Sequence, residues 1–285
     1  MEFQHFCEQT YNQIYIMEFT RILGSKQSNA ASNSAEREAQ RIAIKNTLIQ
    51  AMIAYPGIEA SDVWNAIYVA HLKRKSGVTD LNTIDQELIT RVISADQSWK
   101  KASGHAFESF IFEVANPQLI ASNIQFVLQS RLNEMIHEGN IHNDPHDINW
   151  LNSRIHTDVF DLYAIVSHLN RNFVFGCIQS KTSIRDRVTR DREPSQQAMS
   201  SLFWSIAVTL NGAFLAMPKF QEMVNGGGVD YEQNGWHGMY VMSDQFTNDR
   251  IYPVDLNLNL LITHAQQAAI SWLSARNRFS SDWRP

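Results

Sequence analysis

An acid and a lysine lie in two apolar segments near the middle of the chain. Asp161 lies in HTDVFDLYAIVSH, and Lys181 ends FVFGCIQSK. Both segments are rich in β-branched and aromatic residues, so they predict two neighbouring strands, which we expect to be antiparallel. A carboxylate and an ammonium that converge above a sheet can bind Mg²⁺ and orient a hydroxide for attack on a phosphodiester. The same spacing fits a strand cap beside a surface lysine, and on spacing alone that interpretation is the commoner one.

Basic residues surround and follow this lysine. Between Arg171 and Arg192, six basic and two acidic residues give a local charge of +4 in a chain whose net charge is −5. A phosphate backbone attracts a patch of this kind. Arginine can donate two hydrogen bonds to guanine and aspartate can accept one from cytosine, so Arg185, Asp186 and Arg187 have the chemistry to read G·C pairs. The alternative is a solvated run of charges that pair with one another.

Taken together, these residues resemble the PD-(D/E)XK nucleases, and within them the type II restriction endonucleases whose targets contain a CCGG core. The similarity rests on Glu108 in SWKKASGHAFE, Asp161 in VFDLY, Lys181 in FGCIQSKTSIRDRVTRDREP, and the segment NGWHGMYV. It implies an α/β (α+β) fold with a mixed sheet flanked by helices. It also implies Mg²⁺-dependent cleavage of both strands of double-stranded DNA, with a staggered cut that leaves a 5′ overhang.

The chain departs from the general motif of these nucleases at two positions. Phe160 stands where a proline precedes the first acid, and Gln179 stands where an acid precedes the lysine by two residues. A neutral amide is a poor ligand for Mg²⁺. The resemblance implies that the second acid is displaced onto the following helix, where Glu193 lies twelve residues after Lys181. The alternative role for Glu193 is a favourable interaction with the dipole at a helix start.

The resemblance implies a role for each residue of the site. We expect Mg²⁺ to be held by Asp161, Glu193 and Ser180, and the attacking water to be positioned by Lys181. Glu108 would be an outer acid that holds a water of the metal, or else an exposed helical glutamate.

DNA recognition and assembly follow from the same resemblance. Arg185 and Arg187 would read the guanines of CCGG and Asp186 a cytosine, whereas Arg190 and Arg192 would contact phosphates or brace the site. A palindromic target presents two equivalent strands, so we expect a homodimer. A cognate methyltransferase is expected in the same system. The bases that flank the core do not follow from the sequence.

The helical first part and the mixed second part predict two domains. We expect a helical domain over 1–95, for dimer or DNA contacts, and the catalytic and recognition domain over 96–285. The predicted helices are 1–24, 35–55, 61–75, 83–95, 94–115, about 194–210 and 256–276, with a polar link at 25–34. Further strands are predicted in HGMYVMSD and RIYPVDL.

Composition excludes several other classes of protein. Hydrophobic residues make up 44% of 285, which indicates a folded core. The two cysteines are far apart, which excludes a disulfide framework or a cysteine-rich zinc site and fits a reducing cytoplasm. The N-terminal segment has no signal-peptide pattern. The most apolar stretch, 201–217, contains three polar residues and predicts a buried helix rather than a membrane span.

A group of histidines and aspartates is the main competing candidate for a metal site. Its members are His137, His142, His146, His156, Asp144 and Asp147. Their spacing does not form HExxH, so we do not expect zinc there.

Two other functions remain open at this point. A catalytically silent DNA-binding module with a helical interaction domain would explain Gln179 at a ligand position. A repair or recombination nuclease of the same fold would cut according to DNA structure rather than sequence.

Overall fold

The computed structural model describes residues 2–24, 28–77, 86–155, 159–183, 188–243, 245 and 247–285. The chain divides into two compact units, Met1–Ser109 and Phe110–Pro285. The helix α4, Gln86–Leu119, belongs to both units. The sequence placed a boundary at 95/96. Both that position and the observed division, at 109/110, lie inside α4, so the boundary does not coincide with a helix end.

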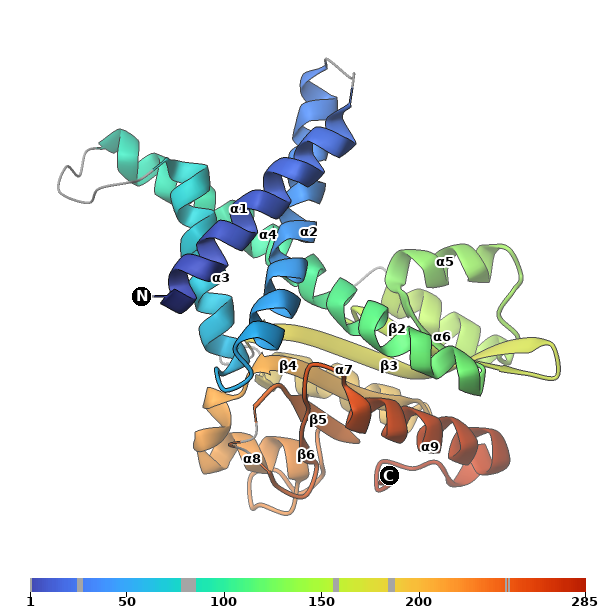
Figure 1. Ribbon diagram of the computed structural model, residues 1–285. Helices are drawn as coiled ribbons and strands as arrows, with labels where there is room; N and C mark the ends of the chain where they lie inside the picture. The colour runs from blue at the N-terminus through green and yellow to red at the C-terminus, as the bar shows by residue number, and fades with distance from the viewer. Residues whose placement is uncertain are drawn as a thin grey trace. The chain divides into compact units, whose positions relative to one another are not determined.

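The N-terminal unit consists of helices. They are α1 (Glu2–Leu23), α2 (Asn29–Ala54), α3 (Ala60–Ser76) and the first part of α4 (Figure 1). The helix α2 begins earlier than predicted because the Ser28 hydroxyl accepts a hydrogen bond from the Ala31 N–H, which makes Ser28 an N-cap. The helix α3 begins at Ala60, one residue before the predicted start. The two helices predicted at 83–95 and 94–115 are one helix, α4.

A buried histidine lies at the centre of this unit. His71 Nδ1 accepts from the Tyr11 hydroxyl at 2.9 Å, and Nε2 lies 3.1 Å from the Ala95 carbonyl. Burial lowers the pKa of His71 to about 4, so the ring is neutral near pH 7. Cys7 of α1 is fully buried in the same unit.

The C-terminal unit is built on a six-stranded mixed sheet in the order β1-β2-β3-β4-β5-β6. The first three strands pair antiparallel and the last four pair parallel. The strands are β1 (Ile124–Leu128), β2 (Leu162–His168), β3 (Arg171–Ser183), β4 (Trp204–Asn211), β5 (Gly238–Val241) and β6 (Ile251–Pro253). The predicted antiparallel pair of strands, β2 and β3, is confirmed.

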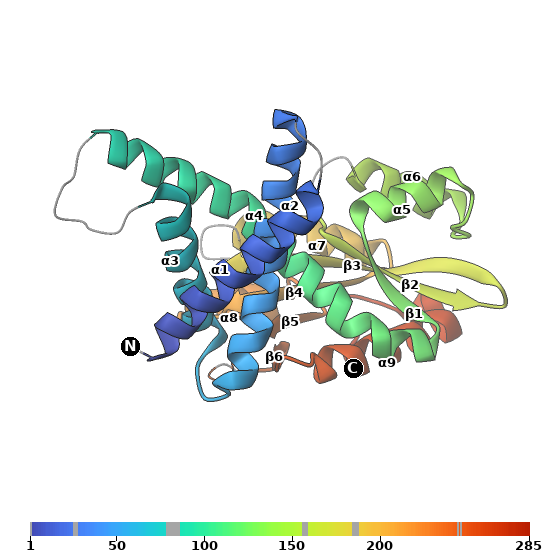
Figure 2. The same cartoon turned by 45° about the horizontal axis from the view of Figure 1, so that its top comes forward.

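Helices cover both faces of this sheet (Figures 1 and 2). One face packs against α5 (Gln129–His137), α6 (Pro145–Ile155), α7 (Val188–Ser200) and α8 (Pro218–Asn225). The helix α9, Asn259–Ala275, packs on the other face, where Trp272 meets Phe173 of β3 and His264 bonds Tyr240 of β5. The unit is therefore a mixed sheet between helical layers, as the sequence predicts.

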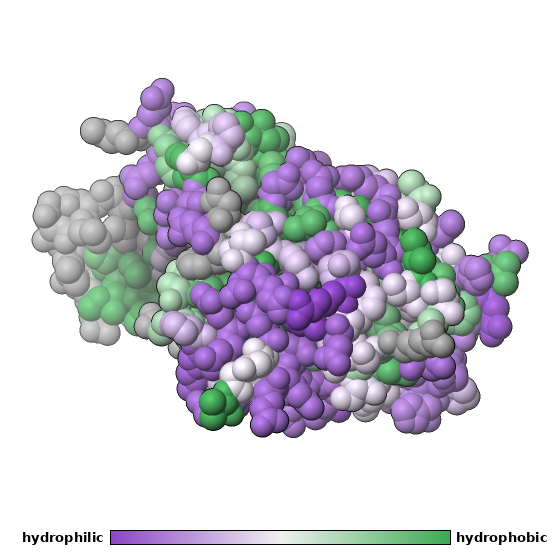
Figure 3. Space-filling model, turned by 90° about the horizontal axis from the view of Figure 1, so that it is seen from below, coloured by the Kyte–Doolittle hydropathy of each residue, from purple (hydrophilic) through white to green (hydrophobic). Residues whose placement is uncertain are grey.

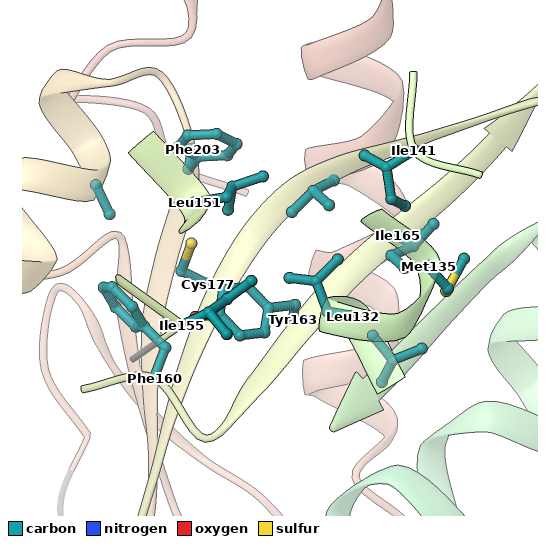
Figure 4. Packing of buried hydrophobic residues seen from close by; sticks show 13 residues of the cluster. Leu132, Met135, Ile141, Leu151, Ile155, Phe160, Tyr163, Ile165, Cys177 and Phe203 are labelled. Carbon is teal, nitrogen blue, oxygen red and sulfur yellow. The ribbon is translucent and has the colours of Figure 1, made fainter. Parts of the chain in front are cut away.

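The core under α5 and α6 is made of large apolar side chains from several elements (Figure 4). Leu132 and Leu151 point from the helices toward Tyr163 of β2 and Cys177 of β3. Each of these four residues is fully buried. Since Cys177 is two residues before Gln179 in the strand, this core leads directly to the candidate site.

One predicted helix is wrong. The sequence suggested a helix over 194–210, but α7 ends at Ser200 and the next apolar run forms β4. Seven of the eight residues of β4 are buried. A parallel strand that is covered on both faces has a continuous apolar sequence, which cannot be distinguished from a buried helix by its periodicity.

The surface is predominantly polar on the face shown in Figure 3, where hydrophobic side chains lie in small groups among hydrophilic ones. Among the described residues, none of the helices combines the length and the apolar character that crossing a membrane would require.

Candidate active site

Asp161 and Lys181 meet at one edge of the sheet. Asp161 directly precedes β2, and its N–H donates to the Ile178 carbonyl of β3 at 3.0 Å. Because β2 and β3 are antiparallel, the start of β2 lies beside the end of β3, where Lys181 is located. This is also the edge at which β3 to β6, which are parallel, end.

The Asp161 carboxylate accepts two hydrogen bonds through the same oxygen. Asp161 Oδ2 lies 2.7 Å from the Ser180 main-chain N and 2.8 Å from Lys181 Nζ. The Asp161 side chain is 17% exposed and the Lys181 side chain is 12% exposed, so the ion pair is shielded from bulk water but remains accessible. Two donors stabilise the ionised acid, and the ammonium is held beside a carboxylate that can bind a cation.

Ser180 contributes to this contact through its main chain. Side chains alternate along a strand, so the Ser180 hydroxyl points to the face opposite Lys181. The hydroxyl is buried and has no hydrogen-bond partner among the described residues. If Ser180 contributes to a metal site on the Lys181 face, its main chain is therefore the part that is well placed to do so.

Gln179 is buried and hydrogen-bonded at both ends of its amide. Its Nε2 donates to the Asp191 carbonyl of α7 at 3.0 Å, and its Oε1 accepts from Trp236 Nε1 at 2.7 Å. The side chain is 1% exposed. The oxygen that would have to bind a metal is already used by the indole of Trp236.

Glu193 lies on α7 and is exposed to solvent. Its Oε1 accepts from Gln197 Nε2 at 3.2 Å, one turn along the helix. The sequence placed Glu193 at a helix start, but α7 begins at Val188, so Glu193 is in the second turn. Because the dipole effect falls off within the first turn, that alternative explanation for Glu193 loses its basis. An exposed carboxylate and the Asp161 carboxylate offer the hard oxygen ligands that suit Mg²⁺.

The two arginines of α7 differ in their surroundings. Arg190 is exposed, whereas Arg192 is partly buried. Arg192 Nε donates to the Met223 carbonyl at 3.1 Å, Nη1 donates to Gln196 Oε1 at 3.0 Å, and Nη2 donates to the Gln233 carbonyl. Burial lowers the pKa of its guanidinium from the usual value. Of the two roles suggested for Arg192, these contacts favour bracing.

Comparison with known proteins identifies the family of this chain. Residues 143–278 match the family described as BsaWI restriction endonuclease type 2. The solved structure "Crystal structure of pre-specific restriction endonuclease BsaWI-DNA complex" is 48% identical, with 100% of this chain and 98% of that chain covered and a TM-score of 0.69. The chain belongs to the BsaWI family of type II restriction endonucleases. It is therefore a site-specific deoxyribonuclease, and the resemblance to restriction endonucleases is confirmed.

A second solved structure supports the fold. The solved structure "Crystal structure of specific restriction endonuclease AgeI-DNA complex" is 16% identical, with 90% of this chain and 91% of that chain covered and a TM-score of 0.54. No curated protein matches the chain.

Four of the predicted site residues lie outside the part of the second unit that the structure describes. Arg185, Asp186 and Arg187 lie outside the described residues. Glu108 belongs to the N-terminal unit, where its Oε2 lies 3.2 Å from His105 Nδ1, and its outer-acid role stays a prediction.

The histidine and aspartate group is joined to an arginine, and one of its members, His156, lies outside the described residues. Asp144, His146 and Asp147 lie close enough to share an ion. Arg276 nevertheless donates to Asp144 Oδ2 at 3.0 Å and to Asp147 Oδ1 at 2.5 Å. Asn143 Nδ2 donates to the other Asp147 oxygen at 3.2 Å. The group therefore attaches the end of α9 to the start of α6.

The sequence did not assign a site role to the segment after α8. Trp236 bonds Gln179, and the Asn234 carbonyl accepts from Gln196 of α7 at 3.3 Å. Both residues lie in NGWHGMYV, one of the segments through which the chain resembles the family. That similarity was the available signal, since no local pattern links Trp236 to a residue so distant in the chain.

Proposed function

We propose that this enzyme cleaves both strands of double-stranded DNA at a palindromic site with a CCGG core, uses Mg²⁺, and leaves a 5′ overhang. The observation that supports this most directly is the contact of Lys181 and the Ser180 N–H with one oxygen of Asp161, in a chain of the BsaWI family. Both similar solved structures are complexes with DNA, which supports DNA as the partner.

The proposed metal ligands are Asp161, Glu193 and Ser180, with Glu108 as an outer acid. Bound Mg²⁺ supplies positive charge beside the scissile phosphate. Lys181 donates to the attacking water and offsets the negative charge that develops on the phosphate. The Ser180 N–H and Lys181 orient the Asp161 carboxylate through two hydrogen bonds to one oxygen. The water oxygen forms a bond to phosphorus while one ester P–O bond breaks.

The proposed readers of the core are Arg185 and Arg187 for guanine and Asp186 for cytosine. They begin four residues after Lys181, in the connection between β3 and α7. So short a connection limits how far the bases that are read can lie from the phosphate that is cut. Arg190 is exposed and is the proposed phosphate contact.

A homodimer on the DNA and a cognate methyltransferase complete the proposal. Two identical sites related by a two-fold axis can cut the two strands of a palindrome. Light scattering with a specific duplex should show two chains on one duplex. One chain per duplex would contradict the dimer.

The deciding experiment is digestion of plasmid DNA in Mg²⁺ and in EDTA, followed by sequencing of the fragment ends. We expect discrete fragments only in Mg²⁺, with staggered ends at sites that share CCGG. Ends without a shared CCGG core would contradict the recognition claim, and cutting that depends on DNA structure would indicate a repair type of nuclease. Binding without cutting in any divalent metal would indicate a catalytically silent module.

Arginine substitutions test the readers separately from catalysis. Each base contact is worth about 1–3 kcal/mol of discrimination, so Arg185→Ala and Arg187→Ala should each abolish specific binding in Ca²⁺. Retained preference for a CCGG duplex in either variant would contradict their role.

A further inference from the structure

The Gln179 amide joins three segments of the C-terminal unit. Gln179 belongs to β3, its donor group bonds the Asp191 carbonyl of α7, and its acceptor bonds Trp236 in the segment before β5. The bonds are 3.0 and 2.7 Å long; the bond to Asp191 is partly buried and the bond to Trp236 is buried. Two well-formed hydrogen bonds from a buried amide restrict how these segments can move relative to one another.

These contacts require an amide at position 179. The amide has a donor for the Asp191 carbonyl and an acceptor for the Trp236 indole N–H. A carboxylate could still accept from Trp236, but its second oxygen would face the Asp191 carbonyl oxygen, with no proton between them. The surroundings therefore favour glutamine over the acid that the general motif has here.

The positions of the bonded residues connect the two halves of the proposed site. Gln179 precedes Lys181 by two residues in β3, and side chains two apart lie on the same face of a strand. Asp191 precedes Glu193 by two residues on α7. The bond from Gln179 to Asp191 thus joins the strand of the lysine to the helix of the proposed second acid.

Arg192 attaches the same turn of α7 to α8 and to the segment before β5. It donates to the Met223 and Gln233 carbonyls, and it packs against Gly235. A Cβ at Gly235 would come within 2.5 Å of the Met223 oxygen and 3.0 Å of Arg192 Cγ, so the glycine leaves room for this arginine. Consecutive residues of α7 are therefore fixed by two independent contacts.

We propose that Gln179 is a positioning residue, which holds α7 so that Glu193 reaches the metal site formed with Asp161. This inference rests on the proposed function, in which Glu193 is the second acid. Gln179 acts through Asp191 and Trp236, without contact to the metal or the DNA.

The first test compares Gln179→Leu with Gln129→Leu. Gln129 is a matched control, because its amide also donates to a main-chain carbonyl, that of Ile155, but lies on α5. We expect Gln179→Leu to raise the Mg²⁺ concentration for half-maximal single-turnover cleavage about tenfold, with DNA binding in Ca²⁺ unchanged. Hydrogen exchange of 188–200 should become faster in this variant and not in the control. Wild-type exchange and Mg²⁺ dependence in Gln179→Leu would overturn the proposal.

The second test uses substitutions that keep the shape of the site. Trp236→Phe removes one of the two bonds, so a smaller change in the same direction is expected. Gln179→Glu can donate to the Asp191 carbonyl only while its carboxyl is protonated, so its cleavage rate relative to wild type should fall as the pH rises. A relative rate that increases with pH would show position 179 acting as a ligand and would overturn the proposal.

Glu193→Gln separates failure of the inference from failure of the proposed function. If Glu193→Gln cleaves like wild type, the proposed metal site and the inference both fail. If Glu193→Gln is inactive while Gln179→Leu behaves as wild type, the metal site stands and the positioning role alone fails.

Discussion

Lys181 and Gln179 lie two residues apart on β3 but meet different chemical surroundings. The ammonium of Lys181 is partly exposed and bonds the Asp161 carboxylate, so it can reach a substrate. The amide of Gln179 is buried, and its bonds within the described part of the chain are to the Asp191 carbonyl of α7 and to Trp236. This difference in exposure fits the catalytic role proposed for Lys181 and the positioning role proposed for Gln179.

Loss of the Lys181 ammonium should affect cleavage far more than binding. For Lys181→Met we expect a decrease in single-turnover rate on the order of a hundredfold or more, because the water loses its positioning donor. Binding to a CCGG duplex in Ca²⁺ should persist. Lys219→Met, at an exposed lysine of α8, is the control and should cleave normally. A nearly normal rate for Lys181→Met would contradict its catalytic role.

The arginines of α7 should separate stability from DNA binding. Arg192→Ala leaves the Met223 and Gln233 carbonyls without a donor and should lower the free energy of unfolding by about 1–3 kcal/mol. Arg190→Ala should leave stability unchanged, weaken binding to all sequences alike and reduce the salt slope by about one. Urea unfolding and binding at several salt concentrations measure both. A loss of stability in Arg190→Ala and a loss of DNA binding alone in Arg192→Ala would contradict both assignments.

Among the elements, those with a local signal could be predicted and those defined by distant partners could not. The strands β2 and β3 are rich in Val, Ile and aromatic residues and are joined by a tight turn at Leu169 and Asn170, both with positive φ. The strand β4 was instead predicted as part of a helix, because burial on both faces removes the alternation of polar residues that indicates a strand.

The candidate site also contains residues whose positions could be predicted from the sequence and contacts that could not. Asp161 and Lys181 end neighbouring apolar segments, so their convergence follows from antiparallel pairing. The partners of Gln179 could not be predicted, since Trp236 is 57 residues away in sequence and Asp191 contributes a main-chain carbonyl. The start of α7 at Val188 was missed because its first turns are polar and charged.

The attachment of α9 to α6 predicts a stability difference between two arginines. Arg276→Met leaves the buried Asp147 carboxylate without its cation and should lower the free energy of unfolding by about 2 kcal/mol or more. Arg284→Met breaks a pair with the exposed Asp249, which is worth about 1 kcal/mol or less. Urea denaturation compares them. Stabilisation of the wild type by Zn²⁺ would contradict the reading of this group as an ion-pair network.

At the scale of the whole molecule, both units contain neutral buried histidines. Burial lowers the pKa of His71 in the first unit, and of His237 and His264 in the second, to about 4. His237 is typical of the arrangement, with Nδ1 accepting from the Ser205 N–H and Nε2 2.9 Å from the Ser280 carbonyl. Protonation would leave Nδ1 with a hydrogen facing another donor.

These histidines predict a loss of stability in mild acid. The unfolded chain binds protons at these histidines near pH 6.5 and the folded chain only near pH 4. The contribution of the histidines to the free energy of unfolding is therefore complete above pH 6.5 and declines as the pH falls toward 4. A fully buried histidine such as His237 should account for roughly 2 kcal/mol between pH 7.5 and 5. Urea unfolding at several pH values measures this decline. His237→Gln should reduce it and His137→Gln, at an exposed site, should not; a stability independent of pH over this range would contradict the prediction.

The two cysteines are distributed one to each unit, Cys7 on α1 and Cys177 on β3. Both are buried, and burial raises the pKa of Cys7 to about 11 and that of Cys177 well above its usual range. Since the thiolate is the form that attacks alkylating reagents, neither sulfur should react until its own unit opens. The two cysteines are therefore separate probes of local unfolding that need no substitution. Mass spectrometry of the labelled peptide from each cysteine, followed over time, would report how often the helical unit and the sheet unit each open.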